Sequence, residues 1–185
     1  MPSVNNHPID KEVIETEFKR LLRVCSERMP PEEVQKQIPA FRRQAQEHAI
    51  NRHILLEEAH RRKIDVSDKE IDLFLAQFPR QQSPETAVNN KPLLDPDNVR
   101  ESIGNALRVD KLVNAIIKSV PEPTNDETLK YLKESELVPA GNKQDSVLMQ
   151  KLVDKTRRLI RHLRQNQALT GFIAELRKKA VIDES

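Results

Sequence analysis

Residues 41–71 read FRRQAQEHAINRHILLEEAHRRKIDVSDKEI, and this segment organises the interpretation of the rest of the chain. Its apolar residues recur three or four positions apart with charged or polar residues between them, and they are Ala45, Ala49, Ile50, Ile54, Leu55 and Ala59. Ser67 and Glu70 have the spacing of a capping box, in which each side chain accepts a hydrogen bond from a free backbone N–H of the other residue. The segment therefore predicts a long amphipathic helix, a short connector and the start of a second helix.

Two runs within this segment resemble the N-terminal chaperone domain of SurA-like parvulin proteins, AINRHILLEEA at residues 49–59 and IDVSDKEI at residues 64–71. Proteins of this family pair a helical chaperone module with a peptidyl-prolyl isomerase domain. Lys63 stands where the family usually has a glycine. The helix is therefore expected to end without the usual left-handed glycine cap.

The resemblance continues on both sides of a missing domain. The run ALRVDKLV at residues 106–113, the proline-rich break after it and residues 124–131 are similar to the family's sequence just before the isomerase domain. The run LRKKAVI at residues 176–182 resembles the segment that follows it. The resemblance implies that residues 1–135 and 145–185 together form one helical chaperone domain. Residues 136–144 are then a linker where the family carries the isomerase, lost by evolution or removed by engineering.

The composition favours helices, because the chain has only three glycines, is 32% charged and is 3% aromatic. We predict a mostly α fold, a bundle of about six to seven helices of which three are long. Pro39 is predicted to divide a short helix from the long one. Residues 4–9, VNNHPI, read as a tight hairpin or a single short strand, and the pattern permits a short β pairing of the N- and C-terminal segments.

The distribution of charge along the chain indicates which kinds of binding partner to expect. The net charge is +2, but residues 151–185 hold nine Lys and Arg against four Asp and Glu. No aromatic residues alternate with these cations, so a solvated helix face is favoured over a nucleic-acid surface, and no nucleic-acid partner is expected. No apolar run approaches the ~18 residues of a membrane span, so no membrane insertion is expected. The chain as written has no signal peptide, which indicates a cytoplasmic protein, or a periplasmic one if this is a mature chain.

The sequence predicts no catalytic residues, no metal centre and no cofactor. Cys25 is alone, and the five histidines lack the i, i+4 spacing of a helical chelate. His53 and Glu57 are four residues apart, and a surface ion pair is the favoured interpretation. Residues 52–55, RHIL, match the parvulin His-Ile-Leu strand signature, but they lie inside a helical pattern and no glycine-rich sequence follows. We therefore expect no isomerase activity in this chain.

The remaining function is binding. We predict an ATP-independent chaperone module that binds unfolded or extended client polypeptides through exposed apolar side chains. The candidate client-binding residues are Met29, Phe41, Phe74, Phe78, Leu93, Leu94 and Met149. For the three phenylalanines, an ordinary place in the core is the competing interpretation.

Two other hypotheses stay open. In the first, the chain is a dimerisation or assembly module whose long helices exchange between protomers, which also permits a homodimeric chaperone. In the second, it is a proline isomerase with an unusual sequence.

Overall fold

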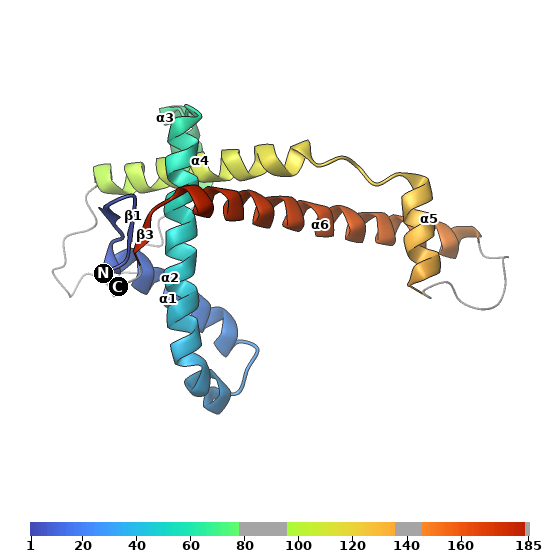
Figure 1. Ribbon diagram of the computed structural model, residues 1–185, viewed down its shortest axis with the longest axis horizontal. Coiled ribbons are helices and arrows are strands. Elements are labelled where there is room, and N and C mark those ends of the chain that lie inside the picture. The colour runs from blue at the N-terminus through green and yellow to red at the C-terminus, as the bar shows by residue number, and fades with distance from the viewer. Residues whose placement is uncertain (78–95, 136–145, 184–185) are drawn as a thin grey trace. The chain divides into compact units, whose positions relative to one another are not determined.

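The computed structural model describes residues 1–77, 96–135 and 146–183. Within these residues the fold is mostly α, as predicted, with six helices and one three-stranded antiparallel sheet (Figure 1). The elements in chain order are β1 (Ser3–Val4), β2 (His7–Pro8), α1 (Lys11–Ser26), α2 (Pro31–Arg61), α3 (Asp68–Gln77), α4 (Pro96–Ser119), α5 (Asn125–Glu134), α6 (Ser146–Lys179) and β3 (Ile182–Asp183).

The chain divides into two compact units. The first holds residues 1–112 together with residues 175–185, and the second holds residues 113–174. The predicted linker, residues 136–144, lies outside the described residues. Whether the two units act as the one domain expected from the sequence stays a prediction.

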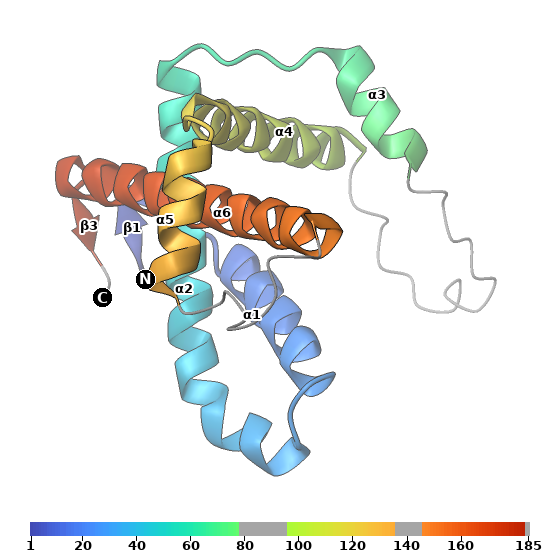
Figure 2. The ribbon, with the colours of Figure 1, turned by 90° about the vertical axis from the view of Figure 1, so that its right-hand side faces the viewer.

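Helices α1 and α2 of the first unit pack along each other (Figure 2). Asp10 caps α1, because its carboxylate accepts a hydrogen bond of 2.8 Å from the Glu12 backbone N–H. The apolar stripe of α1 then meets the first half of α2 in a cluster of buried residues, which are Phe18, Leu21, Val34, Phe41 and Ala45. Ile14, Leu22, Cys25, Met29 and Ile38 pack around this cluster.

A second cluster joins the middle of α2 to both ends of the chain. Its buried residues are Val4, Ile9, Ala49, Ile50 and Ile54, with Ile14, Leu176, Ala180 and Ile182 packed against them. Val4 and Ile50 have no exposed surface. Residues near both termini are therefore needed to cover one face of α2.

The small sheet has the strand order β2-β1-β3, so the N-terminal hairpin pairs with the C-terminal strand (Figure 1). Asn5 and Asn6 connect β1 to β2 with φ values of 49° and 66°. Two left-handed residues are what a tight type I′ hairpin requires, and Asn adopts this conformation more readily than most residues. Asn5 also bonds both backbone groups of Val181, at 2.8 Å and 2.9 Å. Of the two interpretations of residues 4–9, the structure therefore shows the hairpin, and it confirms the pairing of the N- and C-terminal segments.

Pro39 does not divide the helix as predicted. Helix α2 runs from Pro31 to Arg61 with Pro39 inside it, although its first turns bend (Figure 2). Proline removes one helical hydrogen bond and crowds the preceding turn. Val34, Ile38 and Phe41, which flank Pro39 on both sides, all pack in the α1–α2 core. Tertiary packing therefore holds the helix across its proline.

Helices α3 and α4 are joined by ion pairs within the first unit. The capping box at the start of α3 forms, since the Ser67 N–H donates to the Glu70 carboxylate at 2.9 Å. Lys111 Nζ lies 2.7 Å from the same carboxylate and 2.7 Å from the Asp65 carbonyl oxygen. Arg100 donates to Asp72 at 2.6 Å. The connector and α3 are thereby attached to α4.

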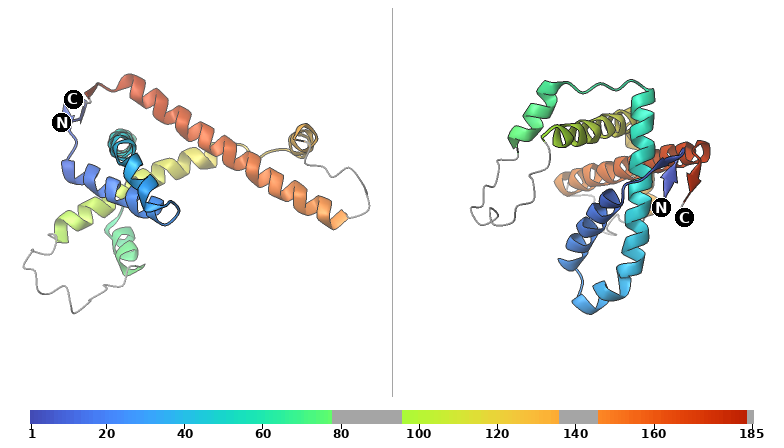
Figure 3. Two further views of the ribbon diagram at one scale, coloured as in Figure 1. Left: turned by 90° about the horizontal axis from the view of Figure 1, so that it is seen from below. Right: turned by 90° about the vertical axis from the view of Figure 1, so that its left-hand side faces the viewer.

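In the second unit α5 crosses α6 (Figure 3). A capping box between Thr124 and Glu127 opens α5. A row of arginines on α6 bonds to residues in the first turn of α5 and just before it, with the pairs Arg157–Asn125, Arg161–Glu122 and Arg164–Glu127. Part of the basic face expected over residues 151–185 is therefore used inside the chain.

Lys63 ends α2 in the left-handed conformation, with φ of 54°. Its N–H donates to the His60 carbonyl at 2.8 Å, and the Ile64 N–H donates to the Ala59 carbonyl at 3.0 Å. These two bonds form a Schellman motif, which usually has glycine at this position. The helix thus keeps the geometry of the glycine cap with a lysine in its place.

Replacing Lys63 by glycine is expected to stabilise the protein. The left-handed conformation costs an L-residue roughly 1–2 kcal/mol, and the greater freedom of glycine in the unfolded chain offsets about 0.5–1 kcal/mol of that gain. Lys63→Gly should therefore raise the free energy of unfolding in urea by about 0.5–1 kcal/mol. Lys63→Ala keeps the Cβ and should bring no gain. An equal gain from both variants would show that removing the lysine charge, not relief of the backbone, is responsible.

Candidate functional site

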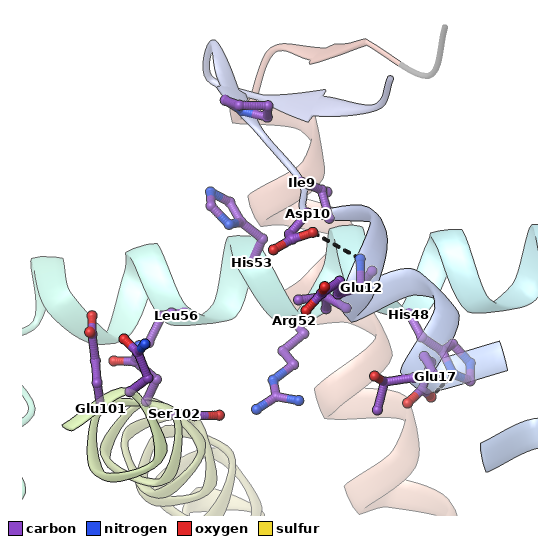
Figure 4. Close-up of a pocket in the computed structure, with 16 residues that line it drawn as sticks. Ile9, Asp10, Glu12, Glu17, His48, Arg52, His53, Leu56, Glu101 and Ser102 are labelled. Carbon is purple, nitrogen blue, oxygen red and sulfur yellow. Dashed lines mark hydrogen bonds and ion pairs between the residues drawn. The ribbon is translucent and has the colours of Figure 1, made fainter. Parts of the chain in front are cut away.

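The first unit contains an open cleft of about 690 Å³ (Figure 4). Three helices and the end of the hairpin line it. On each helix the lining residues recur at helical spacing, so each helix turns one face towards the cleft. The lining residues are Glu12, Val13, Thr16 and Glu17 of α1, His48, Ala49, Arg52, His53 and Leu56 of α2, and Asn98, Glu101, Ser102 and Asn105 of α4. The cleft therefore depends on helices that are distant in sequence.

The floor of the cleft is apolar. Ile9 and Ala49 are nearly buried, with 4% and 3% of their surface exposed, and both belong to the α2 core cluster. Val13 is 41% exposed and also lines the cleft. Leu56 is half-buried on α2. An apolar floor that opens to solvent can accept apolar side chains from a bound molecule.

The rim of the cleft is acidic. Asp10, Glu12, Glu17 and Glu101 line it, and Arg52 is its single Lys or Arg side chain among the described lining residues. Such a rim attracts a positively charged partner. The surface thus combines apolar contact with negative charge.

Glu17 is held by two partners on the α1–α2 side of the cleft. Its carboxylate accepts two hydrogen bonds from Arg20, and one oxygen lies 2.8 Å from His48 Nδ1. The bond from Arg20 is the main cause that lowers the pKa of Glu17 to about 2, with His48 adding to it against the opposing effect of burial. Glu17 therefore stays ionised well into acid and ties α1 to α2.

The predicted client-binding residues lie elsewhere. Phe41 is 6% exposed in the α1–α2 core, and Met29 packs beside it half-buried. Phe74 is half-buried on α3, and Met149 is 40% exposed on α6 in the second unit. Phe78, Leu93 and Leu94 lie outside the described residues. The burial of Phe41 agrees with the competing interpretation as a core residue, and the role of all seven in client contact stays a prediction.

Sequence reasoning missed the cleft, because it searched for aromatic and methionine side chains. The sequence did contain one indication of exposed apolar surface near the cleft. Val13 and Val24 are apolar residues of α1 that lie off its buried stripe, and both are exposed, at 41% and 37%. Val13 lines the cleft and Val24 does not. Their exposure was readable from the helical periodicity, whereas the cleft itself required the packing of α4.

The family model of the SurA-like N-terminal domain matches residues 2–93. Residues 2–93 are a SurA-like N-terminal domain. This match includes β1, β2 and helices α1 to α3, which build most of the first unit. The comparison detects no parvulin domain in the chain. The SurA-like assignment made from residues 49–71 is confirmed, and it indicates a chaperone-type module of the foldase family.

No curated protein and no solved structure matches the chain. Among the helices in the described ranges, none has a stretch long and apolar enough to cross a membrane. The function is therefore inferred from the SurA-like match and from the geometry of the cleft.

The Glu17 contacts predict a pH dependence of stability. A carboxyl group whose pKa falls on folding stabilises the protein above its unfolded pKa of about 4.5, and this contribution is lost as the pH falls towards 2. Glu17→Gln should lower the free energy of unfolding by about 1 kcal/mol at neutral pH, since Arg20 is half exposed and the pair is partly screened. The difference from the parent protein should shrink between pH 4.5 and pH 2.

Urea unfolding followed by circular dichroism at several pH values measures this difference. Glu15→Gln on the same helix is the matched control, because among the described residues the ion pair of Glu15 is an exposed one, with Arg42 at 3.7 Å. Its effect should be a few tenths of a kcal/mol. A Glu17→Gln difference that stays constant from pH 7 to pH 2 would contradict the assignment.

Proposed function

We propose that this chain is an ATP-independent chaperone module that binds extended, unfolded segments of client proteins. The SurA-like match over residues 2–93 is the observation that carries the proposal, because that domain belongs to a chaperone-type module. Capture is reversible and non-covalent. It needs no cofactor, since contact between apolar surfaces and opposite charges supplies the binding energy.

The open cleft of the first unit supports the proposal and suggests where clients bind. Its volume of about 690 Å³ lies within the range of known ligand pockets, and its open form suits an extended chain better than an enclosed ligand. Ile9, Val13 and Leu56 offer apolar contact. The surrounding carboxylates favour client segments in which apolar residues alternate with Lys or Arg. Increasing salt should therefore weaken binding of such a segment.

The first experiment is suppression of aggregation. An unfolded reporter protein is diluted from denaturant with and without the chain, and light scattering is followed over time. The chain should suppress scattering at stoichiometric ratios without ATP. A folded chain that leaves scattering unchanged would refute the proposed function.

A substitution in the cleft tests its role. Val13→Asn removes exposed apolar contact from the floor without adding charge. It should weaken binding of a fluorescent peptide of alternating apolar and lysine residues by about 1 kcal/mol, or roughly fivefold in Kd. Fluorescence anisotropy measures this affinity.

Val24→Asn is the matched control for this substitution. It makes the same change on the same helix at a similarly exposed position outside the cleft. The control should leave the peptide affinity unchanged. An equal loss in both variants would place client contact somewhere other than the cleft.

We also propose that the chain does not catalyse prolyl isomerisation. Residues 52–55, which match the parvulin strand signature, lie inside α2, where Ile54 and Leu55 are buried. They therefore do not supply a strand of an isomerase sheet. A standard assay with a prolyl peptide should give the uncatalysed rate, and any acceleration above buffer would refute this part of the proposal.

The alternative, an assembly module with helix exchange between protomers, stays a prediction. Light scattering of the purified chain gives its mass in solution. A monomer that suppresses aggregation would exclude helix exchange as the basis of activity. A dimer that does not suppress aggregation would favour the assembly module over the chaperone.

A further inference from the structure

Three side chains that coordinate metals well meet beside the hairpin. They are His7 of β2 and the pair His53 and Glu57 of α2. One ligand atom from each lies within 4.8 Å of the other two. His53 also lines the cleft, and Figure 4 shows its ring projecting from α2 towards the strands.

The spacing of the ligand atoms fits a small coordination sphere. Glu57 Oε1 is 3.4 Å from His53 Nε2 and 3.6 Å from His7 Nδ1. In a tetrahedral site with metal–ligand bonds of about 2.0–2.1 Å, neighbouring ligand atoms are about 3.3–3.4 Å apart. The two distances to Glu57 are thus close to tetrahedral edges, and the two imidazole nitrogens, which lie within 4.8 Å of each other, would have to approach one another by side-chain rotation.

His53 Nε2 makes no hydrogen bond within the described part of the chain, although it lies 3.4 Å from Glu57 Oε1. The atom is buried from solvent and makes no hydrogen bond. A buried polar nitrogen without a hydrogen bond is costly, and in native proteins it often indicates an ion or water that completes the site. This nitrogen faces Glu57 Oε1 across the centre of the cluster.

The carboxylate of Glu57 is already oriented from its other side. Asn5 Nδ2 donates to Glu57 Oε2 at 2.6 Å, which leaves Oε1 directed at the two imidazoles. Hydrogen bonds of this kind hold metal-binding carboxylates in place. His7 is 69% exposed on its side chain, so an ion can enter from solvent.

We propose that His7, His53 and Glu57 bind a divalent transition metal ion of the zinc class. Two imidazoles and one carboxylate are ligands that Zn²⁺ accepts, and a water molecule would take the fourth position. The ion would connect β2 to α2. Because β2 pairs with β1 and β1 pairs with β3, it would strengthen the attachment of both chain ends to α2. The proposal does not rest on client binding, although His53 belongs both to this cluster and to the lining of the cleft.

Cobalt substitution tests the proposal. The chain, purified without an affinity tag and stripped of metal, is titrated with Co²⁺, whose visible spectrum distinguishes four-coordinate from six-coordinate sites. The expected result is one Co²⁺ bound per chain with a four-coordinate spectrum, displaced by Zn²⁺, and a higher melting temperature with Zn²⁺. No binding, or a six-coordinate spectrum, would overturn the proposal.

Variants locate the site. His53→Ala and Glu57→Gln should each weaken Co²⁺ binding by more than the 10–100-fold that loss of an outer-shell partner costs. Glu57→Gln keeps the shape of the side chain, so it remains informative if His53→Ala does not fold, as judged by circular dichroism. His60→Ala on the same helix should leave the affinity unchanged. A loss from His60→Ala equal to that from Glu57→Gln would overturn the assignment of the ligands.

Discussion

Burial of Ile50 and its neighbours on α2 is the constraint on which the first unit depends. Ile50 and Val4 have no exposed surface, and Leu176 and Ile182 pack in the same cluster. The covering residues therefore come from the two ends of the sequence. Arg177 reinforces this contact, since it lies 2.8 Å from both Glu47 and Asn51 of α2. The N-terminal hairpin and the end of α6 are thus parts of one core.

Helix α2 serves several contacts at once because it is long enough to expose different faces along its length. Its first half packs on α1, and its middle packs on the sheet. His48, Arg52 and His53 line the cleft, and His53 together with Glu57 also lies beside His7 of the hairpin. The same packing that covers the core therefore also positions the cleft and the histidine–glutamate cluster. The cleft and the cluster therefore share α2 as their support, and His53 belongs to both.

Local features were predictable from sequence because their causes are local. The capping residues Asp10, Ser67 and Thr124 satisfy N–H groups within three positions of themselves. The asparagines of residues 4–9 permitted a hairpin as one of two interpretations, and the structure shows it. Pro39 was the exception, since core contacts of α2 outweighed a local preference. The cleft was not predictable, because α4 meets α1 and α2 only through tertiary packing, and apolar side chains alone do not show which of them stay exposed.

The sequence by itself determined the helical class, the positions of most helix ends and the SurA-like relationship, since these depend on periodicity and on residues close together in the chain. Tertiary structure alone decided that His7 lies beside His53 and Glu57, and that Asn5 bonds Val181 across 176 positions of sequence. The physical reason is that such contacts are selected by the burial of apolar surface shared between distant segments. Only the packing of these distant segments determines which polar side chains meet at the edge of the buried apolar surface.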